Sequence, residues 1–470
     1  MTGTARMRRP LRALALGLAV LVSACSLPLW SHLNGPGRVL PAPPPPVGDV
    51  LVVLALSGGG IRAAALASGT MAELDRLTVP AGNGSNSTIL REVDYISSVS
   101  GGSFAAAFYA LHRDDPQAFA SFSRRFLYRN NETKIAWRLF GNPVNWLRVP
   151  FTDYDRTDVA ARYYSRSLFG DKTFAALPAR PRLILNATDL VTGSRFEFTE
   201  EYFDCLGSDL RSYPLAYAVA ASSAYPVGFA AVTLKNFGQT PERCLTAADR
   251  NYLRSQHLNV AGWLRAVRKQ RFLERDRIPY VHLADGGIAD NLGLGGINER
   301  LADGEISDLL NAAQLKGLVV ILVNAMPAHD TTLGKRSESP SFVEVVNQSF
   351  GLMLEQASTG TSAAFQAALN ERQAFDRAQG RDVSFHFLEV RLSDLENAER
   401  RERLLAAPTR FSLPEPIVTD LIGAGRDLLY CGGGQRRNTA VLRSIIEAFH
   451  KAVGQPGPRA SVALAADVAC

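Results

Sequence analysis

The sequence predicts an α/β fold in which helices flank a mostly parallel central sheet. Two observations support this prediction. Apolar, β-branched runs occur as short blocks, as buried parallel strands do; they lie at 50–56, 95–99, 183–187, 317–324 and, more weakly, 385–390. Segments of helical composition separate these blocks, and strands that alternate with helices favour a parallel sheet.

Four segments between and after the strands have the composition of helices. They are expected over 63–77, 101–112, 341–377 and 439–452. A further short strand over 278–283 ends just before Asp285. Two segments, near 134–151 and 236–277, do not fit the alternation of strands and helices, and we interpret them as insertions.

The N-terminal residues are predicted not to belong to the fold. Residues 1–12 contain four arginines and no acidic residue, and residues 13–22 form an apolar run. This pattern is typical of a secretory signal peptide, and the run is about half the ~20 residues that a spanning helix needs. Residues 22–25 (VSAC) resemble a bacterial lipobox, in which the cysteine, here Cys25, becomes the first mature residue and carries a diacylglycerol. The alternative is an ordinary signal peptide followed by a chance cysteine.

These observations divide the chain into a signal peptide over 1–24, a proline-rich tether over 25–48 and one domain over 49–470 with a helical C-terminal part. The full chain carries a net charge of +6. Four of its basic residues lie in the signal peptide, so residues 25–470 carry only +2. A charge this small gives no case for nucleic-acid binding.

Four cysteines follow Cys25 in the sequence. Export permits disulfides, and four cysteines allow three connectivities. Of these we favour the pairs Cys205–Cys244 and Cys431–Cys470. No Cys/His cluster has the spacing of a zinc site, and we expect neither a metal nor another cofactor.

A glycine-rich loop, SGGGIR at 57–62, follows the first predicted strand. Glycines at a helix start leave backbone N–H groups free to stabilise a phosphate or a developing oxyanion. No Lys-Ser/Thr pair follows, which disfavours a nucleotide P-loop, and the G-x-G-x-x-G spacing is absent. The alternative is a plain tight turn.

Ser100 lies between a predicted strand and a predicted helix, in SVSGG at 98–102. This is the context of a nucleophile elbow, although Ser98 stands where the motif G-x-S-x-G has its first glycine. Asp285 opens a second glycine-rich turn with Gly286 and Gly287, where a carboxylate can approach another loop closely. The alternatives are a structural turn at Ser100 and an Asx turn at Asp285.

Together these motifs resemble the patatin-like phospholipase family. The resemblance is carried by SGGGIR at 57–62, SVSGGS at 98–103, NATDLVTG at 186–193, AASSAYP at 220–226 and DGGIADN at 285–291, with a later match at 411–425. It covers roughly residues 50–295 and implies a three-layer sandwich with a catalytic Ser–Asp dyad.

The resemblance assigns roles to particular residues. Ser100 is the nucleophile and Asp285 accepts its proton directly. The implied oxyanion hole consists of the backbone amides of Gly58, Gly59 and Gly60. Arg62 fixes the loop or meets a lipid phosphate.

Three other polar residues near the motifs are not expected to react. His282 is three residues before Asp285, so on an alternating strand the two side chains point to opposite faces. Ser103 falls one turn into the helix, and Asp290 is interpreted as a turn or capping residue.

The two insertions allow more than one interpretation. The first holds six large apolar residues: Trp137, Leu139, Phe140, Trp146, Leu147 and Phe151. We favour a buried lobe of core over an acyl-chain pocket or a bilayer contact. The second contains a basic amphipathic helix over 260–277, for which we favour a solvated surface over contact with anionic lipid.

The sequence therefore predicts a membrane-anchored serine acyl hydrolase that cleaves acyl esters of phospholipids or lysophospholipids through an acyl-enzyme. Its expected partners are membrane lipids, and its expected place is the periplasm-facing or outer membrane, as an exported lipoprotein. The alternatives are a catalytically inactive lipoprotein that binds lipid or a partner, and an esterase or thioesterase that acts on soluble substrates.

Overall fold

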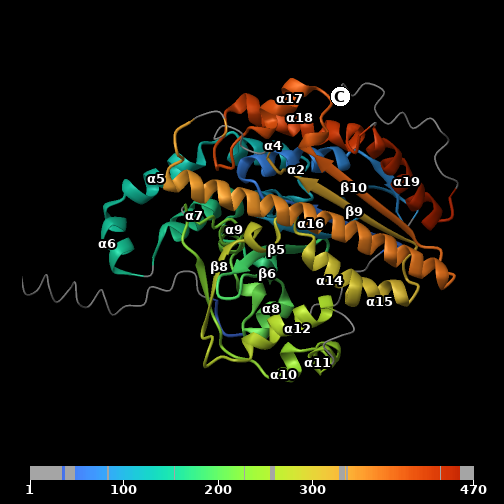
Figure 1. The fold of residues 1–470 in the computed structure, drawn as a ribbon, viewed down its shortest axis with the longest axis horizontal. Coiled ribbons are helices and arrows are strands. Elements are labelled where there is room, and N and C mark those ends of the chain that lie inside the picture. Colours follow the sequence, from blue (N-terminus) through green and yellow to red (C-terminus); the bar gives the residue numbers. More distant parts are fainter. Residues whose placement is uncertain are drawn as a thin grey trace, which may run out of the picture.

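The computed structural model describes residues 34–37, 48–81, 84–152, 154–226, 228–254, 260–327, 334, 337–434 and 436–455. At its centre is an eight-stranded sheet with the order β10-β9-β1-β4-β5-β8-β7, and β6 pairs with β5 (Figure 1). Its strands are β1 (Val50–Leu56), β4 (Val93–Val99), β5 (Arg182–Asp189), β6 (Ser194–Phe198), β7 (Val232–Lys235), β8 (Tyr280–Asp285), β9 (Gly317–Asn324) and β10 (Ser384–Arg391). The strands from β10 to β5 are parallel, and β6, β7 and β8 pair antiparallel. The prediction of a mostly parallel α/β sheet is confirmed.

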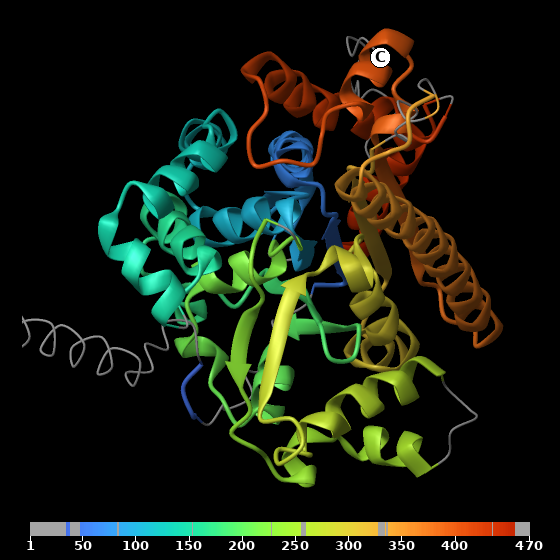
Figure 2. The ribbon, with the colours of Figure 1, turned by 60° about the vertical axis from the view of Figure 1, so that its left-hand side comes forward.

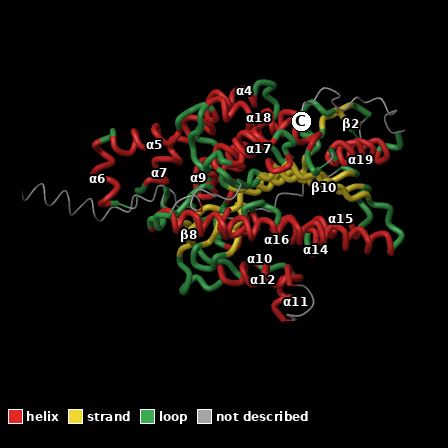
Figure 3. Tube along the Cα trace, turned by 45° about the horizontal axis from the view of Figure 1, so that its top comes forward, coloured by secondary structure: helices red, strands yellow, loops and turns green. Residues whose placement is uncertain are grey.

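Helices cover both faces of the sheet (Figures 1 and 3). One face carries α2 (Gly60–Leu74), α3 (Gly101–His112), α18 (Glu415–Cys431) and α19 (Arg437–Ala452), and the other carries α14 (Gly295–Asp303), α15 (Glu305–Asn311) and α16 (Phe342–Ala378). The side chains of β1 alternate between two hydrophobic cores, one on each face of the sheet. Its even-numbered residues, from Val50 to Leu56, pack into one core, and Leu51, Val53 and Ala55 pack into the other. A strand buried on both faces needs a continuous apolar run, which explains the pattern at 50–56.

The strands predicted over 50–56 and 317–324 coincide with β1 and β9. The predicted strand over 278–283 begins and ends later, as β8, and its last residue is Asp285. The first helix begins at Gly60 rather than residue 63, so the glycine loop itself forms its N-terminus.

The inserted segments are helical. The first contains α5 (Asn131–Phe140) and α6 (Pro143–Phe151), and the second contains α10 (Pro241–Cys244), α11 (Ala247–Arg254) and α12 (Val260–Phe272). In Figure 2 the two insertions project from the body as separate lobes, on the left and at the bottom. The other strands and α-helices are β2 (Thr78–Pro80), β3 (Asn86–Thr88), α4 (Ala118–Phe122), α7 (Arg156–Tyr164), α8 (Glu200–Cys205), α9 (Leu215–Ser222), α13 (Gly287–Asp290) and α17 (Ala398–Leu405).

Part of the predicted tether is attached to the domain. The Asn34 side chain donates to the Lys235 carbonyl at 3.0 Å and accepts from the Lys235 amide at 2.8 Å. The Ser208 hydroxyl donates to the Gly35 carbonyl at 2.7 Å. Residues 34–37, which lie within the predicted tether over 25–48, thus contact the domain.

The disulfide Cys205–Cys244 is present, as predicted, and joins α8 to the end of α10. Cys470 and the predicted signal peptide with Cys25 lie outside the described residues, so those predictions are untested. Among the helices that the structure describes, none is both long and apolar enough to cross a bilayer.

Candidate active site

Ser100 occupies the sharp turn between β4 and α3, with φ 49° and ψ −116°. A left-handed φ at a non-glycine residue costs on the order of 1–3 kcal/mol and is typical of a nucleophile elbow. Ser98 has no positive φ, so the position does not require glycine. The objection raised by Ser98 in the sequence motif is thereby removed.

The turn after Ser100 closes against the glycine loop. A Cβ at Gly101 would overlap the Gly60 backbone, and one at Gly102 would lie 2.7 Å from the carbonyl oxygens of Leu56 and Ser57. These two glycines are therefore required by close backbone approach, which brings the elbow and the loop together.

Side chains from two other elements hold the elbow in its strained conformation. The Ser100 amide donates to the Ser222 hydroxyl at 3.0 Å, and that hydroxyl donates to the Asn186 carbonyl at 2.6 Å. The Asn186 side chain donates to the Ser98 carbonyl at 3.0 Å. Ser103 lies 2.9 Å from the Ser222 hydroxyl and supports the same contacts. Asn186 and Ser222 lie in motifs that carry the family resemblance, but local sequence does not reveal their role, because their partners are distant in the chain.

Asp285 faces Ser100 from the end of β8. The Ser100 hydroxyl donates to Asp285 Oδ2 at 2.8 Å, and the Gly287 amide donates to Oδ1 at 2.8 Å. The backbone of Asp285 is fixed as well, since its amide donates to Ala224 and its carbonyl accepts from Thr188, at 3.0 and 2.8 Å. The two residues predicted as a dyad are thus in direct hydrogen-bond contact.

Both members of the Ser100–Asp285 pair are buried, with exposed fractions of 5% and 6%. Burial raises the pKa of Asp285 from 3.8 to about 6, and the hydrogen bonds from Gly287 and Ser100 partly oppose it. A carboxylate with a raised pKa has a greater affinity for a proton, as a general base requires.

The glycine loop supplies fewer free amides than predicted. The Gly58 amide donates to the Asn291 carbonyl at 2.9 Å, and the Ile61 amide donates to the Arg410 carbonyl at 2.8 Å. The amides of Gly59 and Gly60 have no hydrogen-bond partner among the described residues, and both glycines have a positive φ. The predicted set of three donors is therefore corrected to Gly59 and Gly60.

Arg62 fixes the loop from inside the protein. It is fully buried and donates to the carbonyl oxygens of Ala325, at 2.8 Å, and Ala407, and to the Thr409 hydroxyl at 3.0 Å. Burial lowers its pKa to about 10, so it stays charged at neutral pH. Of the two roles considered for Arg62, the structural one holds, because its donors are used by the protein.

The residues expected not to react are turned to other partners. His282 is exposed on β8 and lies 3.0 Å from the Thr233 hydroxyl. Asp290 accepts the amides of Gly293 and Gly295 at 3.0 and 2.7 Å, as a capping residue does. Neither contact includes Ser100 or Asp285.

The aromatic insertion is not a buried lobe. Its large side chains at 137, 140, 144 and 146 are 76%, 65%, 59% and 63% exposed. This contradicts the interpretation that we favoured, in which apolar composition indicated burial.

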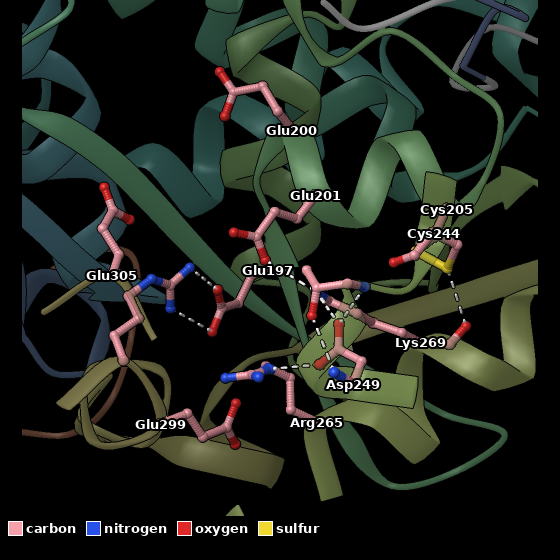
Figure 4. A network of polar contacts seen from close by, with 12 residues as sticks. Glu197, Glu200, Glu201, Cys205, Cys244, Asp249, Arg265, Lys269, Glu299 and Glu305 are labelled. Atoms are coloured by element: carbon pink, nitrogen blue, oxygen red, sulfur yellow. Dashed lines mark hydrogen bonds and ion pairs between the residues drawn. A yellow bond between two sulfur atoms is a disulfide. The ribbon is translucent and has the colours of Figure 1, made fainter. Parts of the chain in front are cut away.

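The basic helix α12 also differs from the solvated surface that we favoured. Lys269 is buried and lies 3.3 Å from both Asp249 and Glu201 (Figure 4). Arg265 pairs with Asp249 at 3.1 Å, and Arg268 pairs with Glu299. Burial alone lowers the pKa of Lys269, but the two carboxylates more than offset this and raise it.

A cavity of about 990 Å³ opens among these ion pairs, and neither Ser100 nor Asp285 lines it. Within the described residues no group of three or more His, Cys, Asp or Glu side chains is arranged to hold a metal ion.

A serine on a strained strand-to-helix turn, hydrogen-bonded to a buried carboxylate, has the arrangement that a serine nucleophile and its base require. The model of the family described as "Patatin-like phospholipase" matches residues 54–296. The chain belongs to this family of lipid acyl hydrolases.

Two solved structures illustrate the similarity beyond the family match. Human GIVD cytosolic phospholipase A2 is 13% identical, with a TM-score of 0.43, over 92% of this chain and 65% of that one. The same human enzyme in complex with methyl gamma-linolenyl fluorophosphonate is 12% identical, with a TM-score of 0.40, over 86% and 60%. The chain thus spans less than two thirds of the length of these structures. Among curated proteins, none matches the sequence significantly.

Proposed function

We propose that this protein is a serine acyl hydrolase that cleaves acyl esters of phospholipids or lysophospholipids through a Ser100–Asp285 dyad. The observation that carries the proposal is the 2.8 Å hydrogen bond from the Ser100 hydroxyl to Asp285. A serine hydroxyl is a weak nucleophile and needs an adjacent base, and here the carboxylate is the group in contact with it.

The reaction follows from the positions of these groups. Ser100 Oγ attacks the ester carbonyl carbon while Asp285 takes the hydroxyl proton. The carbonyl oxygen becomes an oxyanion, which the amides of Gly59 and Gly60 stabilise. Collapse of this intermediate breaks the bond to the alcohol, to which Asp285 returns the proton, and leaves an acyl-Ser100 ester. Water, deprotonated by Asp285, then attacks that ester. As the bond between the acyl carbon and Ser100 Oγ breaks, Asp285 returns the proton to Ser100, which releases the fatty acid and restores the dyad.

Membrane attachment completes the proposal. The sequence pattern at 22–25 supports export and lipidation at Cys25, which would keep the enzyme on the periplasm-facing or outer membrane. Asn34 is fixed to β7, nine residues beyond Cys25. Nine residues span at most about 30 Å, so a lipidated Cys25 would keep the domain close to the membrane.

A labelled fluorophosphonate, which reacts with activated serines, tests the dyad in the full chain. We expect labelling of the wild type, no labelling of Ser100→Ala, and a rate lowered about 10²–10⁴-fold in Asp285→Asn. The matched control is Ser68→Ala, which removes a buried hydroxyl of α2 but leaves Ser100, Asp285 and the residues bonded to them unchanged. Equal labelling of Ser100→Ala and wild type would refute the assignment of the nucleophile.

Release of fatty acid from phospholipid and lysophospholipid vesicles tests the substrate class. We expect release by the wild type and none by Ser100→Ala. Fluorophosphonate labelling without release from either lipid, together with hydrolysis of a soluble ester, would replace the proposal by an esterase acting on soluble substrates.

A further inference from the structure

The α5–α6 hairpin presents three aromatic side chains at one corner. The Trp146 indole donates to the Phe140 carbonyl at 2.7 Å, and the Trp137 ring lies against the turn at Gly141. Trp137, Phe140 and Trp146 thus converge on the turn between the two helices, and all three are more than 60% exposed. The hydrogen bond of Trp146 fixes its ring in this exposed position.

A cleft with arginine side chains adjoins this aromatic corner. It has a volume of about 340 Å³ and is lined by Trp137, Val144 and four arginines, with no acidic residue; the arginines are Arg138, Arg148, Arg162 and Arg166. None of the four forms an ion pair with a described carboxylate, in contrast to the arginines around α12. Such a cleft favours an anion, because each guanidinium keeps its hydrogen-bond donors available.

Tyrosine rings orient three of these arginines. The guanidinium groups of Arg148 and Arg162 lie 4.2 and 4.9 Å from the centre of the Tyr154 ring, and Arg138 lies over Tyr163. Over residues 124–166 the sequence has nine basic and four acidic residues, whereas residues 25–470 as a whole carry only +2. The excess positive charge is therefore concentrated around the exposed aromatic corner.

The base of the hairpin is attached to the active site. The buried Asn131 side chain donates to the Phe411 carbonyl at 3.0 Å, and the Phe411 amide donates to Glu132 at 2.9 Å. The Phe411 ring packs against Phe104 of α3, the helix that begins directly after Ser100. The preceding residue, Arg410, accepts the Ile61 amide of the glycine loop.

We propose that the α5–α6 hairpin docks on a bilayer that contains anionic phospholipid, with Trp137, Phe140 and Trp146 in the interfacial region and a lipid phosphate in the arginine cleft. Aromatic side chains beside basic ones are what the boundary between headgroups and acyl chains accommodates. A soluble acidic protein would pair with the arginines but would leave the aromatic corner in water. The inference rests on the proposed function, because it names the surface that brings lipid to Ser100.

Tryptophan quenching by brominated lipid tests the docking. The full chain has four tryptophans, so Trp30→Phe with Trp263→Phe leaves only Trp137 and Trp146 to report. The quenching measurements use the Ser100→Ala background, so that docking is measured without catalysis. We expect vesicles containing brominated phosphatidylglycerol to quench emission at least threefold more than brominated phosphatidylcholine vesicles, and inorganic phosphate alone to change it little.

Two variants and a matched control separate the contribution of the arginines from that of the aromatic side chains. Arg138→Gln with Arg162→Gln should remove the preference for phosphatidylglycerol. In the catalytically intact chain, Trp137→Ala with Phe140→Ala should lower fatty-acid release from anionic vesicles about tenfold and leave hydrolysis of a soluble ester within twofold. The control is Val260→Ala with Leu264→Ala, which removes side chains of 65% and 43% exposure from another basic helix. It should change neither rate.

Several results would overturn the proposal. Absence of quenching at Trp137 and Trp146 excludes insertion, and equal quenching by the two lipids excludes the phosphate site. A third outcome would separate the two proposals. If phosphatidylglycerol quenches more than phosphatidylcholine but the wild type releases no fatty acid from either vesicle, the proposed function is refuted and the docking surface stands.

Discussion

Asp285→Asn is predicted to stabilise the protein at alkaline pH and not at acidic pH. Burial raises the pKa of Asp285 from 3.8 to about 6. A shift of this size corresponds to about 3 kcal/mol, which is the free-energy cost of keeping the carboxylate ionised in the folded protein above pH 6. Asparagine carries no charge and can still accept from Gly287 and bond to Ser100, so the variant avoids this cost.

The sign of the pH dependence follows from proton binding. Between pH 3.8 and about 6 the folded protein binds this proton more tightly than the unfolded chain. Stability from Asp285 is therefore fully present below pH 3.8 and is lost as pH rises through 6. The gain in the free energy of unfolding on Asp285→Asn should be about 3 kcal/mol at pH 8 and close to zero at pH 4.

Urea denaturation of the two proteins from pH 4 to pH 8 measures this difference directly. Asp276→Asn is the matched control, because it makes the same substitution at an exposed aspartate. A difference for Asp285→Asn that does not vary with pH, or a variant less stable than wild type at pH 8, would refute the reasoning. Either result would mean that the carboxylate is solvated or neutral in the folded protein.

Three further outcomes follow from the same structure. On a soluble ester, kcat/KM should be level above about pH 6 and fall tenfold per pH unit below it, because Asp285 must be ionised to accept the proton. Ser98→Gly should leave turnover within twofold and lower stability by about 1 kcal/mol, since residue 98 is part of a strand and gains nothing from glycine. Reducing the Cys205–Cys244 disulfide, which spans 39 residues, should lower stability by about 4 kcal/mol, measured as a fall in Tm.

Sequence patterns predicted best the strands in which nearly every residue is buried and must therefore be apolar. β1 and β9 are buried on both faces, so all their residues except Asn324, at the end of β9, are apolar, and the run itself marks where each strand lies. Ser100 and Asp285 were predictable for a related reason. Each stands beside glycines that close backbone approach requires, and these glycines are visible in the sequence.

The predictions failed for hydrogen bonds and ion pairs whose two partners lie far apart in the chain. Nothing local in the sequence indicates that Asn291 takes the amide of Gly58, or that Asp249 and Glu201 pair with Lys269. The exposure of Trp137 was missed for a different reason. Apolar composition normally indicates a core, whereas an exposed apolar patch is typical of an interaction surface.

Two features of the candidate site cost stability, and the proposed reaction uses both. The left-handed conformation of Ser100 turns its hydroxyl toward Asp285, and the burial of Asp285 makes its carboxylate basic. Neither feature would persist in a loop free to relax. Here β4 and β8 are set in one sheet through β5, whose Asn186 and Thr188 bond to the Ser98 and Asp285 carbonyls. The buried sheet thus offsets the strain and the desolvation, because relaxing either would require separating strands that both cores hold in place.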